Sequence, residues 1–290
     1  MTNLSIPSKL KKRLRWFAAV AMVALVFALL GGCAPVASRV LLFPQAPVTS
    51  VAPAERVMIA NADGDIETVR YRNMREQKPV EAIVLRFYGN ADQASYQVAN
   101  EARELQPWSV EIWGVNYPGF GHSGGSASLA GVVRAAEIAY REAQKRALPI
   151  YVIGTSMGTT AALYLTAHRE IAGAFLINPP PLREIILGDY GWWNLWLLAG
   201  PISWGIPHDL GSTRNAARTY CPVVLMTSEK DSLVPPPYQD AIFEAIAGPK
   251  VRVIAKGVGH NDAPPLAAKE EALQALRAQG WRSREARTTE

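Results

Sequence analysis

The segment Gly154–Gly158, with the sequence Gly-Thr-Ser-Met-Gly, places a serine between two glycines. The apolar run Ile150–Ile153 precedes it and the small helix-forming residues of Thr159–Ala167 follow, which predicts a strand, a sharp turn and a helix. Glycines suit such an elbow because its backbone is strained and crowded, and the elbow lifts the hydroxyl of Ser156 clear of the sheet. The chemistry indicated is nucleophilic attack on an acyl carbon, with the amide of Met157 donating to the developing oxyanion.

A serine hydroxyl is a weak nucleophile unless a histidine accepts its proton and an acid orients that histidine. The chain has four histidines, at His122, His168, His208 and His260. Where the nucleophilic serine lies on such a strand–turn–helix elbow, the three residues follow one another along the chain in the order serine, acid, histidine. Only His260, in the loop Gly257–Asp262, lies beyond the last apolar run. Asp231 follows the run Val223–Thr227 and is the predicted acid, with Glu229 as the alternative.

Strands and helices alternate along the body of the chain. Short apolar runs suit strands buried on both faces of a parallel sheet, and they lie at Ala82–Phe87, Val110–Val115, Ile150–Ile153, Ala172–Ile177, Val223–Thr227 and Val251–Ile254. Before them, Arg56–Ala60 and Ile66–Tyr71 flank an Asp-Gly hairpin signal. The stretch 129–140 has apolar residues at helical spacing, with Ser128 as its N-cap. These patterns predict an α/β fold with a mostly parallel central sheet flanked by helices.

Residues 178 to about 219 interrupt this alternation after the strand that ends near Ile177, and they are numerous enough for a small helical cap. Trp192, Trp193 and Trp196 lie in this segment. Trp192 and Trp196 are four residues apart and would share one helix face. One interpretation is that these side chains pack the cap onto the body. The other is that they form an apolar wall over a substrate pocket, and the two are compatible.

From about residue 55 to 280, the motifs together resemble the α/β-hydrolase superfamily, especially membrane-associated members with His-Gly-Asn-Ala and Gly-His-Asn-Asp loops. Phe87–Asp92 (Phe-Tyr-Gly-Asn-Ala-Asp) stands where the first loop falls, and Asn116–Ser123 resembles the loop after the next strand. The resemblance implies an α/β-hydrolase fold, a Ser-His-Asp mechanism without a cofactor, and a second oxyanion amide from Asn90. Tyr88 replaces the family's histidine and is a further candidate for the substrate pocket.

The first 32 residues have the features of a signal peptide. They contain five basic side chains and no acidic one, followed by the uncharged run Trp16–Leu30. The ending Leu30–Cys33 resembles a bacterial lipobox, which implies that Cys33 becomes the fatty-acylated first residue of the mature chain. The alternative is an uncleaved N-terminal membrane anchor. Because Ala34 is not an acidic retention residue, the resemblance favours the periplasmic face of the outer membrane in a bacterial cell envelope.

Charge and residue spacing exclude several other classes of protein. The net charge of +5 equals that of the first 32 residues, so the remainder is neutral and a nucleic-acid partner is not expected. Gly119–Gly124 fits a dinucleotide fingerprint, but no ribose-binding acid follows the next strand. No cluster has metal-ligand spacing, and two cysteines, Cys33 and Cys221, cannot form a disulfide scaffold.

The predicted organisation is a signal peptide (1–32), a tether (33–53), a hydrolase domain (54–280, with a cap at about 178–219) and a polar tail (281–290). The predicted function is a lipid-anchored serine hydrolase that cleaves carboxylic esters through an acyl-enzyme, with a small-molecule or lipid acyl ester as substrate and the membrane as a partner. Thioester or protein deacylation, peptide cleavage and a non-catalytic envelope lipoprotein remain alternatives. The oligomeric state stays open.

Overall fold

The computed structural model describes residues 8–29, 32–72, 79–104, 108–189, 191 and 197–281. Within them one eight-stranded sheet has the order β1-β2-β4-β3-β5-β6-β7-β8. The strands are β1 (Glu55–Ile59), β2 (Ile66–Arg72), β3 (Ala82–Phe87), β4 (Val110–Val115), β5 (Ile150–Thr155), β6 (Gly173–Ile177), β7 (Val223–Ser228) and β8 (Lys250–Ala255). All eight lie where the sequence predicted them, which confirms the α/β fold.

Of the eight strands described, β2 alone runs opposite to the others. β1 and β2 pair antiparallel as the predicted hairpin, and β2 also runs antiparallel to β4. From β4 to β8 every pairing is parallel. The carboxyl ends of these strands therefore meet at one edge of the sheet, and the loops that follow β3, β5, β7 and β8 are brought together there.

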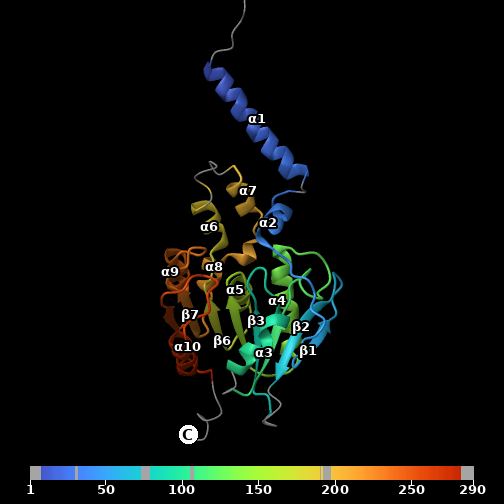
Figure 1. Cartoon of the computed structure of the whole chain (residues 1–290), viewed down its shortest axis with the longest axis vertical. Coiled ribbons are helices and arrows are strands. Elements are labelled where there is room, and N and C mark those ends of the chain that lie inside the picture. Colours follow the sequence, from blue (N-terminus) through green and yellow to red (C-terminus); the bar gives the residue numbers. More distant parts are fainter. Residues whose placement is uncertain are drawn as a thin grey trace, which may run out of the picture.

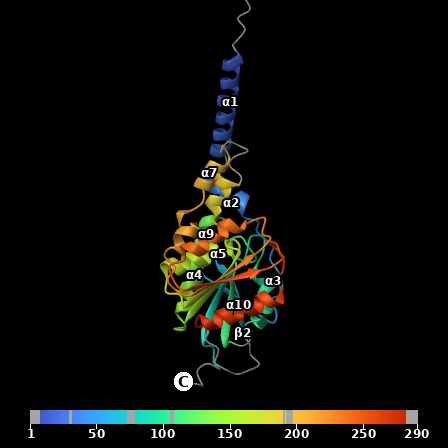
Figure 2. The same ribbon diagram turned by 90° about the vertical axis from the view of Figure 1, so that its left-hand side faces the viewer.

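Helices cover both faces of the sheet, as Figures 1 and 2 show. On one side lie α3 (Ala94–Glu104) and α10 (Leu266–Ala278), and on the other lie α4 (Leu129–Gln144), α5 (Gly158–His168) and α9 (Pro236–Ala245). All six residues of β3 are buried because both faces are covered. Ile83, Leu85 and Phe87 contribute to one core, whereas Val84 contributes to the other, as strand alternation requires. The predicted N-cap of α4 is confirmed, since the Ser128 hydroxyl accepts a hydrogen bond from the Gly131 amide.

Short helices are inserted between β6 and β7, in agreement with the predicted cap. They are α6 (Leu182–Gly188), α7 (Ala199–Trp204), η3 (His208–Leu210) and α8 (Ser212–Ala216). α6 packs against α7 above the carboxyl edge of the sheet, whereas α8 packs against α5. Trp192, Trp193 and Trp196 lie outside the described residues.

The segment predicted as a tether is partly folded onto the body, which corrects the prediction for residues 33–53. It begins with α2 (Cys33–Leu41), in which Val36 and Ala37 are buried, and α2 packs against α7 and α4. The Ser38 hydroxyl accepts a hydrogen bond from the Leu129 amide at 3.1 Å. Composition rich in Ala, Pro and Val suggested a linker, but proline is tolerated in the first helical turn, and the apolar residues share one face.

The two ends of the chain differ in how they relate to the body. α1 (Ser8–Leu29) extends away from it at the end occupied by α2, α6 and α7 (Figure 1), and most of its apolar side chains are exposed. In the described part of the chain, no helix combines the length and the apolar character that crossing a membrane requires. At the other terminus, Trp281 is buried and its carbonyl accepts a hydrogen bond from the Trp108 indole, so the body extends one residue beyond the predicted boundary.

Candidate active site

Ser156 occupies a strained turn between β5 and α5. Its φ is 50°, in the left-handed region that non-glycine residues seldom adopt, and its amide donates to the carbonyl of Ile177 on β6 at 2.8 Å. A Cβ on Gly158 would overlap the carbonyl oxygen of Phe87 at the end of β3. Glycine is therefore required at this position for the start of α5 to approach β3, and the strand–turn–helix elbow predicted from the sequence is present.

The structure brings together the three residues that the sequence proposed as a triad. Nε2 of His260 lies 2.8 Å from Oγ of Ser156, and Nδ1 of His260 lies 2.7 Å from Oδ2 of Asp231. The Asp231 side chain is fully buried and that of His260 is 6% exposed. With Nδ1–H donating to the carboxylate, Nε2 is free to accept the serine proton.

Asp231 is held in place by its own loop. Its Oδ1 accepts hydrogen bonds from the amides of Leu233 at 3.0 Å and Val234 at 2.7 Å, and its Oδ2 accepts one from Nε2 of Gln239 at 3.1 Å. Four donors, counting His260, thus satisfy a buried carboxylate. The alternative acid, Glu229, instead accepts a hydrogen bond from the Gly257 amide at 2.7 Å.

Two supporting residues were missed by the sequence analysis. Asn178, at a φ of 49° directly after β6, donates from Nδ2 to the Ser228 hydroxyl at 3.0 Å and to the carbonyl of His260 at 3.3 Å. Gln239 on α9 anchors Asp231 and also donates to the Val234 carbonyl at 2.7 Å. Asn178 could have been found from the sequence because it is a polar residue at the end of a central strand. No local pattern in the sequence indicated Gln239.

The two candidate oxyanion amides lie beside the serine. Met157 directly precedes α5, where the unsatisfied amides of a helix N-terminus point outward. Asn90 lies in the loop after β3, and a Cβ on the preceding Gly89 would be 3.6 Å from Cβ of Ser156. In the described part of the chain, neither amide donates a hydrogen bond to another protein group.

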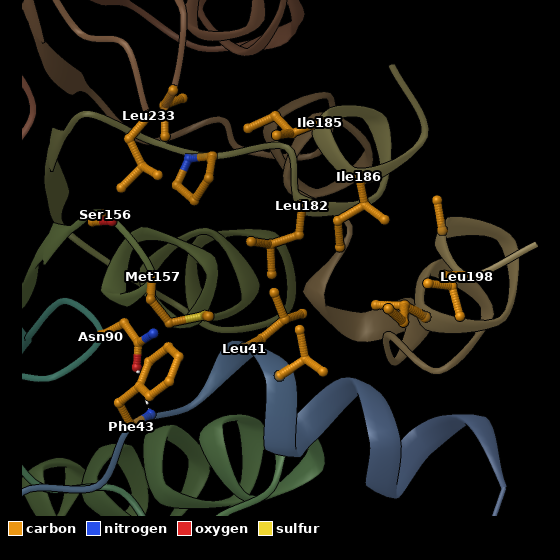
Figure 3. Close-up of a pocket in the computed structure, with 15 residues that line it drawn as sticks. Leu41, Phe43, Asn90, Ser156, Met157, Leu182, Ile185, Ile186, Leu198 and Leu233 are labelled. Atoms are coloured by element: carbon orange, nitrogen blue, oxygen red, sulfur yellow. Dashed lines mark hydrogen bonds between the residues drawn. The ribbon is translucent and has the colours of Figure 1, made fainter. Parts of the chain in front are cut away.

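An apolar cavity of about 430 Å³ begins at Ser156 and extends under the cap. Figure 3 shows Ser156 and Asn90 at one end of the lining and Leu198 at the other. The remaining lining residues are Val40, Leu41, Phe43, Met157, Pro180, Leu182, Ile185, Ile186, Ala199, Ile202, Leu233 and Val234. Among the described lining residues none is charged, so the cavity suits an aliphatic or aromatic group better than a polar one.

The wall formed by α2 is the functional element that the sequence analysis failed to predict. Val40, Leu41 and Phe43 belong to the segment interpreted as a tether. The signal that could have found them is the run of apolar residues at helical spacing between Val36 and Leu41.

Tyr88 is not a substrate-pocket residue, which corrects the prediction. Its side chain is 1% exposed and lies in the core beneath α3, and its hydroxyl donates to Oε2 of Glu101 at 2.9 Å. Burial, together with the negative charge of Glu101, raises the pKa of Tyr88 well above its ordinary value, so the phenol stays protonated. Because side chains alternate along an extended strand, Tyr88 follows Phe87 onto the opposite face of the sheet.

Neither the two cysteines nor any cluster of possible metal ligands in the described residues forms an arrangement comparable to that of Ser156, His260 and Asp231. Cys221 is half-buried before β7, and burial raises its thiol pKa to about 11. Cys33 is a free thiol at the start of α2. Within the described ranges, no group of three or more His, Cys, Asp or Glu side chains could hold a metal ion.

Sequence comparison finds relatives but assigns no family. No protein-family model matches the sequence. Two uncharacterized proteins of Mycobacterium tuberculosis are each 29% identical over 248 residues, which cover 82% of this chain and 85% of theirs.

Solved structures resemble the fold. An esterase from Pyrococcus furiosus superposes with a TM-score of 0.61 at 14% identity, over 82% of this chain and 97% of the esterase. Est1E from Butyrivibrio proteoclasticus superposes with a TM-score of 0.60 at 14% identity, over 77% of this chain and 99% of Est1E. A monoacylglycerol lipase from Paleococcus ferrophilus superposes with a TM-score of 0.56 at 14% identity, over 74% of this chain and 98% of the lipase. The chain therefore has the α/β-hydrolase fold, and at these identities the likeness extends to the fold alone.

Proposed function

We propose that this protein is a serine hydrolase that cleaves carboxylic esters with an apolar acyl group, and that its N-terminal segment anchors it to a membrane. One observation carries the proposal: Oγ of Ser156 lies 2.8 Å from a histidine whose other ring nitrogen is held by a buried carboxylate, at the end of an apolar cavity. A hydrogen-bonded Ser-His-Asp chain beside an apolar cavity has no evident structural role, and it matches what acyl transfer requires.

The reaction proceeds in two halves. In the first, Nε2 of His260 accepts the hydroxyl proton while Oγ of Ser156 attacks the ester carbonyl, and Asp231 stabilises the imidazolium that forms. The alcohol then leaves with the proton from Nε2, and the acyl group stays on Ser156. In the second half, Nε2 of His260 takes a proton from a water molecule that attacks the acyl-enzyme; it returns this proton to Oγ of Ser156 as the bond between Oγ and the acyl carbon breaks, and the carboxylic acid is released.

The negative charge of each tetrahedral intermediate needs donors that are already in position. The amides of Met157 and Asn90 supply them in this proposal. Each well-aligned donor lowers the barrier by about 3 kcal/mol in comparable enzymes. Because both are backbone groups on fixed turns, they require little reorganisation when the charge develops.

The acyl group occupies the cavity between α2 and the cap. The uncharged lining disfavours charged or peptide-like groups, which would lose hydration without gaining partners. Thioesters would use the same residues, since only the leaving group differs. Anchoring proceeds through fatty acylation of Cys33 in a bacterial cell envelope, on the periplasmic face of the outer membrane.

Covalent labelling with a fluorophosphonate probe tests the activated serine. The full-length chain is expected to label and Ser156→Ala is not, while Ser126→Ala, at an exposed serine outside the site, labels like the parent. A panel of p-nitrophenyl esters should then show a preference for acyl chains longer than acetate. A folded parent that neither labels nor hydrolyses any ester would refute the proposal.

A further inference from the structure

The mouth of the cavity is surrounded by large apolar side chains that are exposed to solvent. Val40, Phe43, Leu198 and Leu233 line the cavity and are nevertheless 41–55% exposed. They come from three separate parts of the chain: the end of α2, the cap, and the loop that carries Asp231. Soluble proteins rarely gather such side chains at one place unless the surface meets an apolar partner.

Trp204 extends this surface toward the proposed anchor. Its side chain is 78% exposed at the end of α7, which packs against α2. The next residue, Gly205, lies against the start of α2, since a Cβ there would overlap the carbonyl of Cys33. The residue proposed for acylation is thus next to the most exposed tryptophan described, and Leu198, just before the same helix, lines the cavity. We call Val40, Phe43, Leu198, Trp204 and Leu233 the apolar rim.

The N-terminal segment leaves the body at this end. Figures 1 and 2 both show α1 extending away from the body beyond α2 and α7. If residues 1–32 are removed, the acyl chains on Cys33 begin here; if they are retained, the C-terminal end of α1 lies here, and α1 exposes Trp16, Phe17 and Met22. Either form of the proposed anchor brings the bilayer next to the apolar rim.

We propose that the apolar rim docks on the lipid bilayer, so that the cavity mouth opens onto the acyl layer and the substrate is an ester dissolved in that layer. This rests on the proposed anchoring and deepens the proposed function, because it names the source of the substrate. A bilayer is the occupant favoured by continuity with the anchor. An apolar acyl chain then passes from the membrane to Ser156 without crossing water.

Site-specific depth measurements test the docking without relying on catalysis. An environment-sensitive fluorophore is attached to Trp204→Cys or Tyr220→Cys, each in full-length protein with Cys221→Ser, and the background without the added cysteine is subtracted. Tyr220 is the matched control because it is 73% exposed and lies just before the amino end of β7, whereas the cavity lies at the carboxyl ends of the strands. The vesicles contain phosphatidylethanolamine, phosphatidylglycerol and lipids carrying a nitroxide on the acyl chain.

The label at 204 is expected to shift to shorter wavelength and to be quenched at least threefold more than the label at 220. Equal quenching at both positions would overturn the proposal. So would a label at 204 that becomes shielded as protein concentration rises in the absence of lipid, because a second copy of the chain would then cover the rim.

A second experiment compares two substrates with Trp204→Asp and Tyr220→Asp. Trp204 does not line the cavity, so hydrolysis of a water-soluble butyrate ester is expected to be unchanged in both variants. Hydrolysis of a long-chain acyl ester embedded in vesicles is expected to fall at least fivefold in Trp204→Asp only. Equal losses on both substrates, or no loss, would overturn the docking.

The two proposals fail in different ways. If the parent hydrolyses neither ester but the label at 204 enters the bilayer, the proposed function is wrong and the docking stands. If the parent hydrolyses the soluble ester while the label at 204 stays in water, the docking is wrong and the proposed function stands.

Discussion

The backbone amide of Phe43 donates a hydrogen bond to Oδ1 of Asn90 at 2.9 Å, joining the segment that follows α2 to the loop after β3. The same oxygen accepts the amide of Ala91 at 3.0 Å, and Ala91 has a φ of 60°. Nearby, Nε2 of Gln93 donates to the carbonyl of Ala46 at 2.8 Å. The chain next to the proposed anchor therefore holds the loop that supplies a proposed oxyanion amide.

Replacing the Asn90 side chain should show whether this side chain positions the oxyanion amide or binds the substrate. Asn90→Ala keeps the backbone amide but removes the acceptor for Phe43 and Ala91, so the loop loses its fixed position. We expect kcat for a short ester to fall roughly tenfold, with KM within about twofold, because small displacements of a donor weaken transition-state stabilisation most. Gln144→Ala, at an exposed amide on α4, is the control. A change in KM alone would contradict this role.

The acid of the triad can be identified by a pair of charge-neutralising variants. Asp231→Asn leaves the shape of the site but favours the wrong tautomer of His260, so kcat should fall by about 10⁴. Glu229→Gln should leave kcat within about threefold, since Glu229 contacts the Gly257 amide and not His260. Steady-state hydrolysis of a soluble ester measures both. A larger loss in Glu229→Gln than in Asp231→Asn would reverse the assignment.

Gly158 should tolerate no side chain. A Cβ there overlaps backbone atoms of Phe87 and approaches the carbonyl of Tyr88, and backbone cannot move aside as a flexible side chain can. We expect Gly158→Ala to lower the free energy of unfolding by about 3 kcal/mol. Gly200→Ala, on α7, meets nothing within 4 Å and should change it by less than about 1 kcal/mol. Urea denaturation followed by circular dichroism compares them, and equal effects would contradict the packing argument.

Tyr88→Phe tests whether Tyr88 serves the core and not the substrate pocket. The variant loses the hydrogen bond to Glu101, so stability at neutral pH should fall by about 1 kcal/mol while kcat/KM is unchanged. Burial raises the pKa of Tyr88, so its contribution to stability is present below the ordinary tyrosine pKa and is lost as pH rises above it. The free energy of unfolding should therefore decline less between pH 9 and 11 in Tyr88→Phe than in the parent. A changed KM for esters would restore a role in the pocket.

The thiol of Cys221 should react slowly with alkylating reagents. Burial raises its pKa to about 11, so at pH 8 the reactive thiolate is far scarcer than for an unperturbed cysteine. Alkylation by iodoacetamide, followed for the Cys221 peptide by mass spectrometry, should be at least tenfold slower in the folded chain than in urea. The rate in the folded chain should rise as pH increases from 8 to 10. Equal rates in the folded chain and in urea would show that the thiol is accessible and unperturbed.

Local patterns predicted most of the fold. Apolar runs such as those of β3 and β7 identify buried parallel strands, and Ser128 with its apolar stripe identifies α4, because burial periodicity and capping depend on neighbouring residues. The elbow around Ser156 and the order of Asp231 and His260 also follow from the chain itself. The sheet edge on which these loops converge follows from parallel strands connected by helices.

Tertiary structure decided which distant segments complete the site. That α2 forms a wall of the cavity depends on its burial against α7 and α4, and the sequence alone offered Ala, Pro and Val in a stretch that reads as a linker. Tyr88 faces the core because the alternation of β3 continues past its end, and a motif resemblance could not reveal this. Asn178 bonds Ser228, which lies 50 residues away, and Gln239 on α9 bonds Asp231 in the loop after β7. Such contacts arise only when the whole core has formed, because long-range packing sums many weak burial terms that no short stretch of sequence contains.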